Sequence, residues 1–387
     1  MTRRLVAQAL GALVALGCGG SDQQTPSPSA GGSSQSGAGG GGGGGGDTST
    51  SGSTSGGTSG GASTAVTPPC GIYLGGAVRP DAFVSGILVT QFWPELEPAA
   101  GSYDFSRLDA WLDDLPEGQR FALRLLGMEP PHVVAAAAST WTWVDMLDEC
   151  PPPDGCERPV PWDDQALTYF EGMVAALSQA TVTAGGVSAP LAQHPALEEV
   201  MLTLPGWSRI RELNFEIESL PGYERSLLIA GTKRALAAQV NSFPGTPVFV
   251  QFFSVEDGAE PPLWEELRDA ITADPALDAV GFYQENLAHS VVDGVETFRP
   301  ATAFAAPIFT SKELTFTGFQ ALTSWAEPFT GGERVAGGSP PAAMSWALET
   351  YGSRYFELYA EDIDAANTTH PEWKAAYEEI AAKLCEP

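Results

Sequence analysis

Basic residues are scarce in this 387-residue chain, where 19 Lys and Arg stand against 48 Asp and Glu and give a formal net charge of −29 at pH 7. A surface of that sign repels phosphate groups, so nucleic acids and anionic membrane surfaces are unfavourable partners. Histidine is also scarce, at four residues, and no cysteine pair has the two-residue spacing of common zinc sites. We therefore expect no metal and no other cofactor.

The motifs of two further enzyme classes are missing. No Gly-x-Ser-x-Gly elbow follows an apolar strand, and no Ser-His-Asp spacing indicates a serine hydrolase. No glycine-rich phosphate turn follows an apolar run, which argues against the alternative of a doubly wound open sheet that binds a nucleotide.

The first 17 residues have the layout of an export signal. Arg3 and Arg4 precede the apolar run LVAQALGALVALG, which is too short to span a bilayer. The run leads to Cys18, and the sequence ALGC at residues 15–18 resembles the box of bacterial lipoproteins. The resemblance implies cleavage before Cys18, lipid attachment to its sulfur, and an exported protein anchored at the cell envelope or surface. An ordinary signal peptide with an incidental cysteine is the alternative.

Residues 18–69 are rich in Gly, Ser and Thr and nearly lack apolar side chains; they include eight consecutive glycines at Gly39–Gly46. Such a segment cannot bury enough surface to offset its ordering entropy, so we expect a disordered tether with a root-mean-square reach of about 40 Å. Residues 70–387 then form one folded domain of the size that an α/β barrel needs.

Four cysteines remain once Cys18 is assigned to the lipid: Cys70, Cys150, Cys156 and Cys385. An even number in an exported chain suggests two disulfides, although the sequence alone does not fix the pairing. Cys150 and Cys156 are the natural local pair. Cys70 and Cys385 would then clasp the two ends of the folded domain, which barrel closure brings together.

Apolar runs alternate with amphipathic helical stretches, which predicts a parallel sheet with crossover helices. The pattern favours a (β/α)8 barrel, with helical stripes at Leu167–Leu177 and Trp373–Leu384. The expected strands are residues 86–92, 121–127, 199–204, 247–253, 279–284, 305–310 and 354–360, with a doubtful third strand at 159–162.

The segment Gln91–Leu115 carries the pattern W-x-x-x-E-P-x-x-G-x-Y-D-F directly after the first expected strand. This pattern resembles the first βα unit of retaining barrel glycoside hydrolases, the clan that includes β-galactosidase-like and cellulase-like families. Arg124 and the segment 354–362 support the resemblance, which covers the rest of the folded region only loosely. It implies two catalytic carboxylates at the carboxyl ends of the strands and a carbohydrate substrate.

Carried over by position, the resemblance makes Glu212, after strand four, the acid/base and Glu313, after strand seven, the nucleophile. The usual Asn-Glu pair after strand four is absent, since Arg211 precedes Glu212. Lys312 beside Glu313 is not typical of a nucleophile, and Glu285 and Glu357 are rivals for that role. Aromatic and polar side chains near the strand ends are candidate sugar contacts: Trp93, Glu95, Glu97, Arg124, Trp207, Tyr283, Asn286 and Trp325.

Each candidate also has a structural interpretation. Glu95 and Glu97 could cap a helix or pair with Arg124. Glu212 could pair with a neighbouring arginine on the surface, and Glu313 could open a helix at 314–322. The tryptophans are as typical of a core as of a sugar platform.

Two hypotheses for the function remain, with a third behind them. The first is a surface-anchored retaining glycoside hydrolase that cuts an extracellular oligo- or polysaccharide. The second is a catalytically inactive barrel that binds glycans or has a structural role at the envelope, which the missing Asn-Glu pair favours. A metal-dependent barrel hydrolase would need His and Asp at strand ends that the sequence does not offer.

Overall fold

The computed structural model describes residues 66–76, 78–126, 128–143, 155–207, 217–251, 261–292, 295–299, 310–326 and 338–386. The expected export signal, the expected lipidation site at Cys18 and most of the expected tether lie outside these ranges, as do Cys150 and Glu212.

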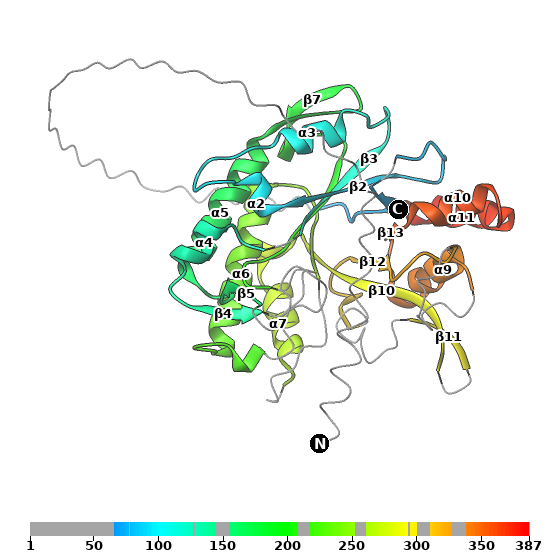
Figure 1. The fold of residues 1–387 in the computed structure, drawn as a ribbon. Coiled ribbons are helices and arrows are strands. Elements are labelled where there is room, and N and C mark those ends of the chain that lie inside the picture. The colour runs from blue at the N-terminus through cyan, green and yellow to red at the C-terminus, as the bar shows by residue number, and fades with distance from the viewer. Residues whose placement is uncertain are drawn as a thin grey trace, which may run out of the picture. The chain divides into compact units, whose positions relative to one another are not determined.

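Eight parallel strands close into a barrel (Figure 1). Each strand pairs in parallel with the next, and the last pairs with the first. The fold is therefore a (β/α)8 barrel, as the sequence predicts. In barrel order the strands are β1 (Gly71–Gly75), β2 (Gly86–Phe92), β3 (Arg120–Leu126), β8 (Leu197–Leu202), β9 (Val248–Gln251), β10 (Val280–Val292), β12 (Thr317–Ala321) and β13 (Tyr355–Leu358).

Helices connect the strands and cover the outside of the barrel. They are α2 (Trp93–Leu96), α3 (Ser106–Leu112), α4 (Pro131–Ala136), α5 (Asp164–Gln179), α6 (Arg225–Ser242), α7 (Leu263–Thr272), α9 (Pro340–Tyr351), α10 (Ala360–Asn367) and α11 (Pro371–Leu384). Two hairpins stand apart from the barrel: β4 (Thr140–Trp143) with β5 (Cys156–Pro159), and β6 (Thr181–Ala184) with β7 (Val187–Pro190). Strand β11 (Val295–Arg299) pairs antiparallel with the end of β10.

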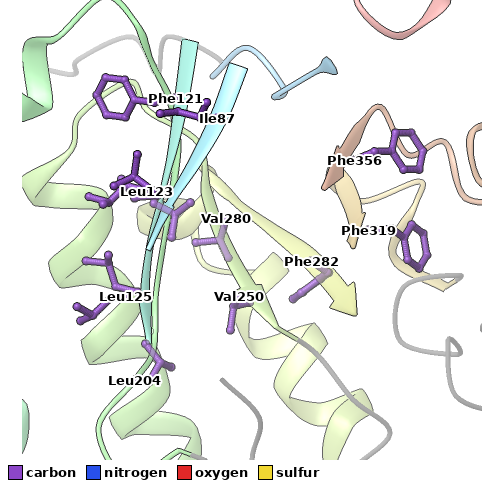
Figure 2. Packing of buried hydrophobic residues seen from close by; sticks show 14 of the residues in the cluster. Ile87, Phe121, Leu123, Leu125, Leu204, Val250, Val280, Phe282, Phe319 and Phe356 are labelled. Carbon is purple, nitrogen blue, oxygen red and sulfur yellow. The ribbon is translucent and has the colours of Figure 1, made fainter. Parts of the chain in front are cut away.

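Alternation along the strands separates two cores. Outward-facing side chains such as Leu123, Val250 and Phe356 belong to the large apolar cluster that includes the helices (Figure 2). Inward-facing side chains form a smaller cluster inside the barrel, made of Tyr73, Leu88, Ala122, Met201, Phe249, Tyr283 and Tyr355. Because the small cluster contains three tyrosines, the barrel interior offers hydroxyl groups to polar neighbours.

Strand β12 contributes a glycine where most of the other strands bring large side chains. A Cβ atom at Gly318 would lie 2.8 Å from Phe249 Cζ and 3.0 Å from Tyr355 Cδ1. The rings of Phe249 and Tyr355 lie 5.2 Å apart, so no room is left between them. Glycine at this position therefore allows the two rings to pack inside the barrel.

Three of the strand predictions are wrong. The first barrel strand is β1, so Gln91–Leu115 follows the second strand and not the first. The piece at 159–162 is no barrel strand, because Pro159 ends β5 of a peripheral hairpin. The seventh strand is β12, where a helix was expected at 314–322; residues 305–309 of the strand expected at 305–310 lie outside the described residues. The helical stripes expected at Leu167–Leu177 and Trp373–Leu384 are confirmed in α5 and α11.

The two ends of the barrel domain are joined covalently. Cys70, just before β1, and Cys385, just after α11, form a disulfide with a Cα–Cα distance of 5.3 Å, which confirms the expected clasp. Cys156 is also disulfide-bonded. In the ranges given above, no helix is both long enough and apolar enough to cross a bilayer.

Candidate active site at the carboxyl end of the barrel

Two carboxylates and an amide share one row on the inner wall of the barrel. Glu285 of β10 lies opposite Gln320 of β12, which in turn lies opposite Glu357 of β13. Tyr283 contacts Glu357 across the interior, and residues two apart on a strand share a face, so Glu285 also points inward. The row lies near the carboxyl ends of the strands, where barrel enzymes hold their catalytic groups.

Glu357 is the most strongly held carboxylate of this row. Arg124 of β3 forms an ion pair with its Oε2 atom, and the Tyr283 hydroxyl donates a hydrogen bond to the same oxygen. Tyr355 donates to the other oxygen, Oε1, over 3.0 Å. Arg124 also donates to the Tyr283 hydroxyl over 2.9 Å. Because the side chains of Glu357 and Arg124 are only 1% and 6% exposed, the ion pair is buried and favours the ionised form of Glu357.

Below this row, a third carboxyl group lies deeper in the barrel. Glu199 of β8 is fully buried, and its Oε1 lies 3.1 Å from the Tyr355 hydroxyl. Burial raises the pKa of Tyr355 well above the usual value of 10. Sequence reasoning missed Glu199, although the alternation in LEEVML places it on the same face as Met201 of the barrel interior.

Glu285 is the more accessible carboxylate of the row. Its side chain is half-buried, whereas that of Glu357 is buried. Strands are spaced about 4.8 Å apart, so the Cα atoms of Glu285 and Glu357, two strands apart, are separated by roughly 10 Å. Two glutamate side chains that converge from that distance can bring their carboxyl groups to the ~5 Å of a retaining glycosidase.

The two residues assigned by position from the resemblance are not in this row. Glu212 lies outside the described residues. Glu313 lies in the turn before β12, is exposed, and so stands at the amino-terminal end of the barrel, opposite the row. The expectation that Glu313 follows strand seven is therefore wrong, because that strand begins only at Thr317. At the carboxyl ends themselves, strand four is followed by Thr203 and strand seven carries Gln320.

The residues around the W-x-x-x-E-P pattern form a structural corner. The Trp93 indole N–H donates to Glu97 Oε2 over 2.9 Å, and the Gly101 backbone N–H donates to Glu97 Oε1 over 2.9 Å. His132 lies 3.3 Å from the same carboxylate. Glu95 pairs with Arg107 instead. The alternative in which Glu95 or Glu97 pairs with Arg124 is wrong, since Arg124 pairs with Glu357.

The remaining aromatic candidates are buried. Trp207 is 2% exposed and Trp325 is 8% exposed, and both belong to the large apolar core. Tyr283 is fully buried inside the barrel. The side chain of Asn286 lies outside the described residues. Thus Tyr283 and Arg124 meet at Glu357, while both tryptophans pack in the protein interior.

Glu129 forms a second buried ion pair beyond the end of β3. The Arg158 guanidinium donates to both of its oxygens over 3.0 Å, and the Gly206 backbone N–H donates to Oε1 over 2.7 Å. The pair ties the loop after β3 to β5 and to the loop after β8. It therefore fixes two of the loops that border the carboxyl end of the barrel.

Asp362 of α10 holds the loop after β12. Its Oδ1 accepts hydrogen bonds from the Ser324 hydroxyl over 2.9 Å and from the backbone N–H groups of Trp325 and Ala326 over 2.7 and 2.9 Å. Burial outweighs these donors and raises the pKa of Asp362 from 3.8 to about 7. A buried carboxyl group thus positions the loop that carries Trp325.

This raised pKa makes the stability depend on pH. The folded state holds the proton of Asp362 up to about pH 7, whereas the unfolded chain releases it near 3.8. We therefore expect its contribution to the unfolding free energy to be complete below about pH 4 and lost by about pH 7. Asp362→Asn cannot ionise, and we expect it to be more stable than the parent at pH 8, by at most about 4 kcal/mol. Urea unfolding at pH 5 to 8 measures the effect.

Asp364→Asn on the same helix is a matched control. The Arg79 guanidinium lowers the pKa of Asp364, so that carboxylate stabilises the fold above its unfolded pKa and loses this effect as the pH falls. Asp364→Asn should therefore not gain stability at pH 8. Equal pH profiles for Asp362→Asn and the parent would contradict the prediction.

No group of three or more His, Cys, Asp or Glu in the described ranges is placed to hold a metal ion. The described residues form instead a row of two carboxylates and one amide, in which Glu357 contacts an arginine and two tyrosines. Its chemistry is that of acids, bases and carboxylate nucleophiles.

No protein-family model matches the chain, and no curated sequence matches it. Among solved structures, the β-galactosidase from Rahnella sp. R3 is similar with a TM-score of 0.45 and 13% identity, over 78% of this chain and 52% of that one. The exo-β-1,4-mannosidase Op5Man5 from Opitutaceae bacterium strain TAV5 has a TM-score of 0.44 and 10% identity, over 84% and 63%.

The β-mannanase from the blue mussel Mytilus edulis has a TM-score of 0.39 and 13% identity, over 78% of this chain and 81% of that one. The chain spans about half of the length of the β-galactosidase and under two thirds of that of the mannosidase. Sequence identities of 10% and 13% assign no role to individual residues of this chain.

Proposed function

We propose that the protein is an exported glycoside hydrolase that cuts an oligo- or polysaccharide outside the cell by a two-carboxylate retaining mechanism. The observation that carries the proposal is the inner row of Glu285, Gln320 and Glu357 at the carboxyl end of the barrel. A retaining mechanism needs one carboxylate that stays ionised and one carboxyl group that can exchange a proton with the sugar oxygen.

The environments of the two carboxylates suggest their roles. Arg124 keeps Glu357 ionised, so Glu357 would attack the anomeric carbon and form the glycosyl-enzyme bond while the leaving oxygen departs. Glu285, nearer to solvent, would protonate that oxygen and then take a proton from the water that hydrolyses the intermediate. Gln320 between them can hydrogen-bond a sugar hydroxyl through its amide.

The location is part of the proposal. The signal layout of residues 1–17 and the box at Cys18 support a lipid anchor at the bacterial envelope, and residues 19–69 would serve as the tether. The partners are then a carbohydrate substrate and, through the lipid on Cys18, a membrane. This arrangement would give a barrel held about 40 Å from the membrane access to glycans outside the cell.

A second candidate function is glycan binding without hydrolysis. It is favoured by Gln320, an amide at the end of strand seven where the resemblance implies the nucleophile. The enclosure of Glu357 also favours it, since the contacts with Arg124, Tyr283 and Tyr355 engage both carboxylate oxygens. A barrel of this kind would bind a polysaccharide and release no reducing ends.

Glu285→Gln is the sharpest test, because Glu285 is half-buried and its replacement leaves the Arg124–Glu357 pair intact. With aryl glycosides and a panel of polysaccharides as substrates, we expect kcat/KM to fall at least about 100-fold. Glu357→Gln should be at least as inactive, and circular dichroism would establish that it is folded. Proton NMR of the first product formed by the parent should show retained anomeric configuration.

Glu313→Gln serves as the matched control, since it makes the same chemical change on an exposed side chain at the opposite end of the barrel. It should keep the activity of the parent. Full activity of Glu285→Gln would remove that residue from the mechanism. Binding of a polysaccharide by calorimetry, with no reducing ends released by the parent, would establish the second function instead.

A further inference from the structure

The Tyr355 hydroxyl lies between two buried carboxyl groups. It is 3.0 Å from Glu357 Oε1 and 3.1 Å from Glu199 Oε1, and all three side chains are at most 1% exposed. Both distances are those of hydrogen bonds. A phenol has a single proton, so Tyr355 can donate to only one of the two oxygens.

The other contact needs a proton of its own. Two carboxylate oxygens cannot both face the same hydroxyl as acceptors, because one of them would meet a lone pair instead of a proton. Tyr355 itself keeps its proton, since burial raises its pKa well above the usual value of 10. Hence one of the carboxyl groups, Glu199 or Glu357, is protonated and donates to the tyrosine oxygen.

Arg124 decides which of the two carries the proton. Its guanidinium pairs with Glu357 and so favours the ionised form of that group. In the part of the chain that the structure describes, the titratable groups that act on Tyr355 are Tyr73 of β1, Arg124 of β3, Glu199 of β8 and Tyr283 of β10. Of these, Tyr73 and Tyr283 are neutral phenols at neutral pH, so Arg124 is the cation that distinguishes the two carboxyl groups.

We propose that Glu199 is a protonated carboxylic acid at neutral pH, that it donates its hydrogen bond to Tyr355, and that Tyr355 in turn donates to Glu357. The chain of two hydrogen bonds runs from strand four to strand eight through the barrel interior. Glu199 is then a positioning residue, which orients the Tyr355 hydroxyl toward Glu357 without touching a substrate.

This arrangement matters for the chemistry of Glu357. An ionised Glu199 would compete for the Tyr355 proton and add a second negative charge to the barrel interior, whereas a neutral Glu199 leaves the proton to Glu357. The ionised carboxylate then has three donors: Arg124, Tyr283 and Tyr355. The consequence of this arrangement for catalysis rests on the proposed function. The protonation of Glu199 does not.

Infrared difference spectroscopy of the full-length protein at pH 7 tests the proposal. The parent-minus-Glu199→Gln spectrum should contain the C=O band of a protonated carboxylic acid, and the band should shift in D2O. The glutamine amide can still donate to Tyr355, so we expect this variant to fold and to keep the activity of the parent within about threefold, whereas Glu199→Leu should lose the hydrogen bond.

Glu198→Gln is a matched control on the neighbouring residue. Glu198 pairs with Arg120 and accepts a hydrogen bond from the Cys70 backbone N–H, so its difference spectrum should contain carboxylate bands only. Carboxylate bands in the Glu199→Gln spectrum as well would overturn the proposal.

A second measurement avoids variants altogether. In parent protein labelled with 13C at the glutamate side-chain carboxyl group, one resonance should have the shift of a protonated acid at pH 7. The label excludes Asp362, whose pKa is also raised. If every resonance titrates as an ordinary glutamate, the proposal fails. If the protonated resonance is present but no hydrolysis is ever found, the proposal stands and the proposed function fails.

Discussion

Replacing Arg124 by methionine should lower the free energy of unfolding by about 3–5 kcal/mol, measured by urea denaturation at pH 7. Among the described residues, Arg124 is the cation that compensates the charge of Glu357, and its removal leaves a carboxylate that is 1% exposed. The substitution also removes the hydrogen bond that Arg124 donates to Tyr283. The methionine fills most of the volume, so the loss reports the uncompensated charge and not a cavity.

Two variants make this prediction specific. Glu357→Gln in the Arg124→Met background removes the buried charge, and should recover part of the lost stability. Arg107→Met breaks the pair with Glu95, in which the side chains are 59% and 37% exposed, and should cost at most about 1 kcal/mol. A cost below about 1 kcal/mol for Arg124→Met would mean that Glu357 is already protonated, which would contradict the role proposed for it.

The pattern of the chain predicts the barrel but misplaces some of its strands. Strand β2 and helices α5 and α11 are long and periodic, so their bounds follow closely from the sequence. Strands β1 (GIYLG) and β12 (TGFQA) are short and contain glycine, which weakens the apolar signal. In β12 the glycine leaves room for the rings of Phe249 and Tyr355, which come from other strands. No local pattern reveals this contact between strands.

These misplaced strands shift the expected positions of the catalytic groups. With β1 missed, the W-x-x-x-E-P pattern follows the second strand, and with β12 missed, Glu313 falls before strand seven. The strand ends predict Glu357, Tyr283 and Arg124 as candidate site residues. They do not predict that the three side chains contact one another. These residues come from strands three, six and eight and meet only because the barrel closes. The local sequence around them therefore favours Glu95 or Glu97 as the ion-pair partner of Arg124.

The disulfide Cys70–Cys385 should make the second large contribution to stability. It joins residues 315 positions apart, so it restricts nearly the whole unfolded domain. Chain-entropy scaling for a loop of that length gives at most about 6 kcal/mol, and measured losses are commonly about 2–5 kcal/mol. We therefore expect the Cys70→Ser/Cys385→Ser protein to lose about 2–5 kcal/mol in urea denaturation at pH 7, with little change in its folded structure.

The folded ends should stay in place because other contacts hold them. The Cys70 backbone N–H donates to Glu198 Oε1 over 2.8 Å, and Arg120 donates to the Cys70 carbonyl over 3.0 Å. The double serine variant should therefore keep the circular dichroism of the parent. Replacing Cys150 and Cys156, whose expected pairing closes a far shorter loop, should cost only about 2 kcal/mol. If both double variants lost the same stability, loop length would not explain the effect, and the clasp would act through the folded state.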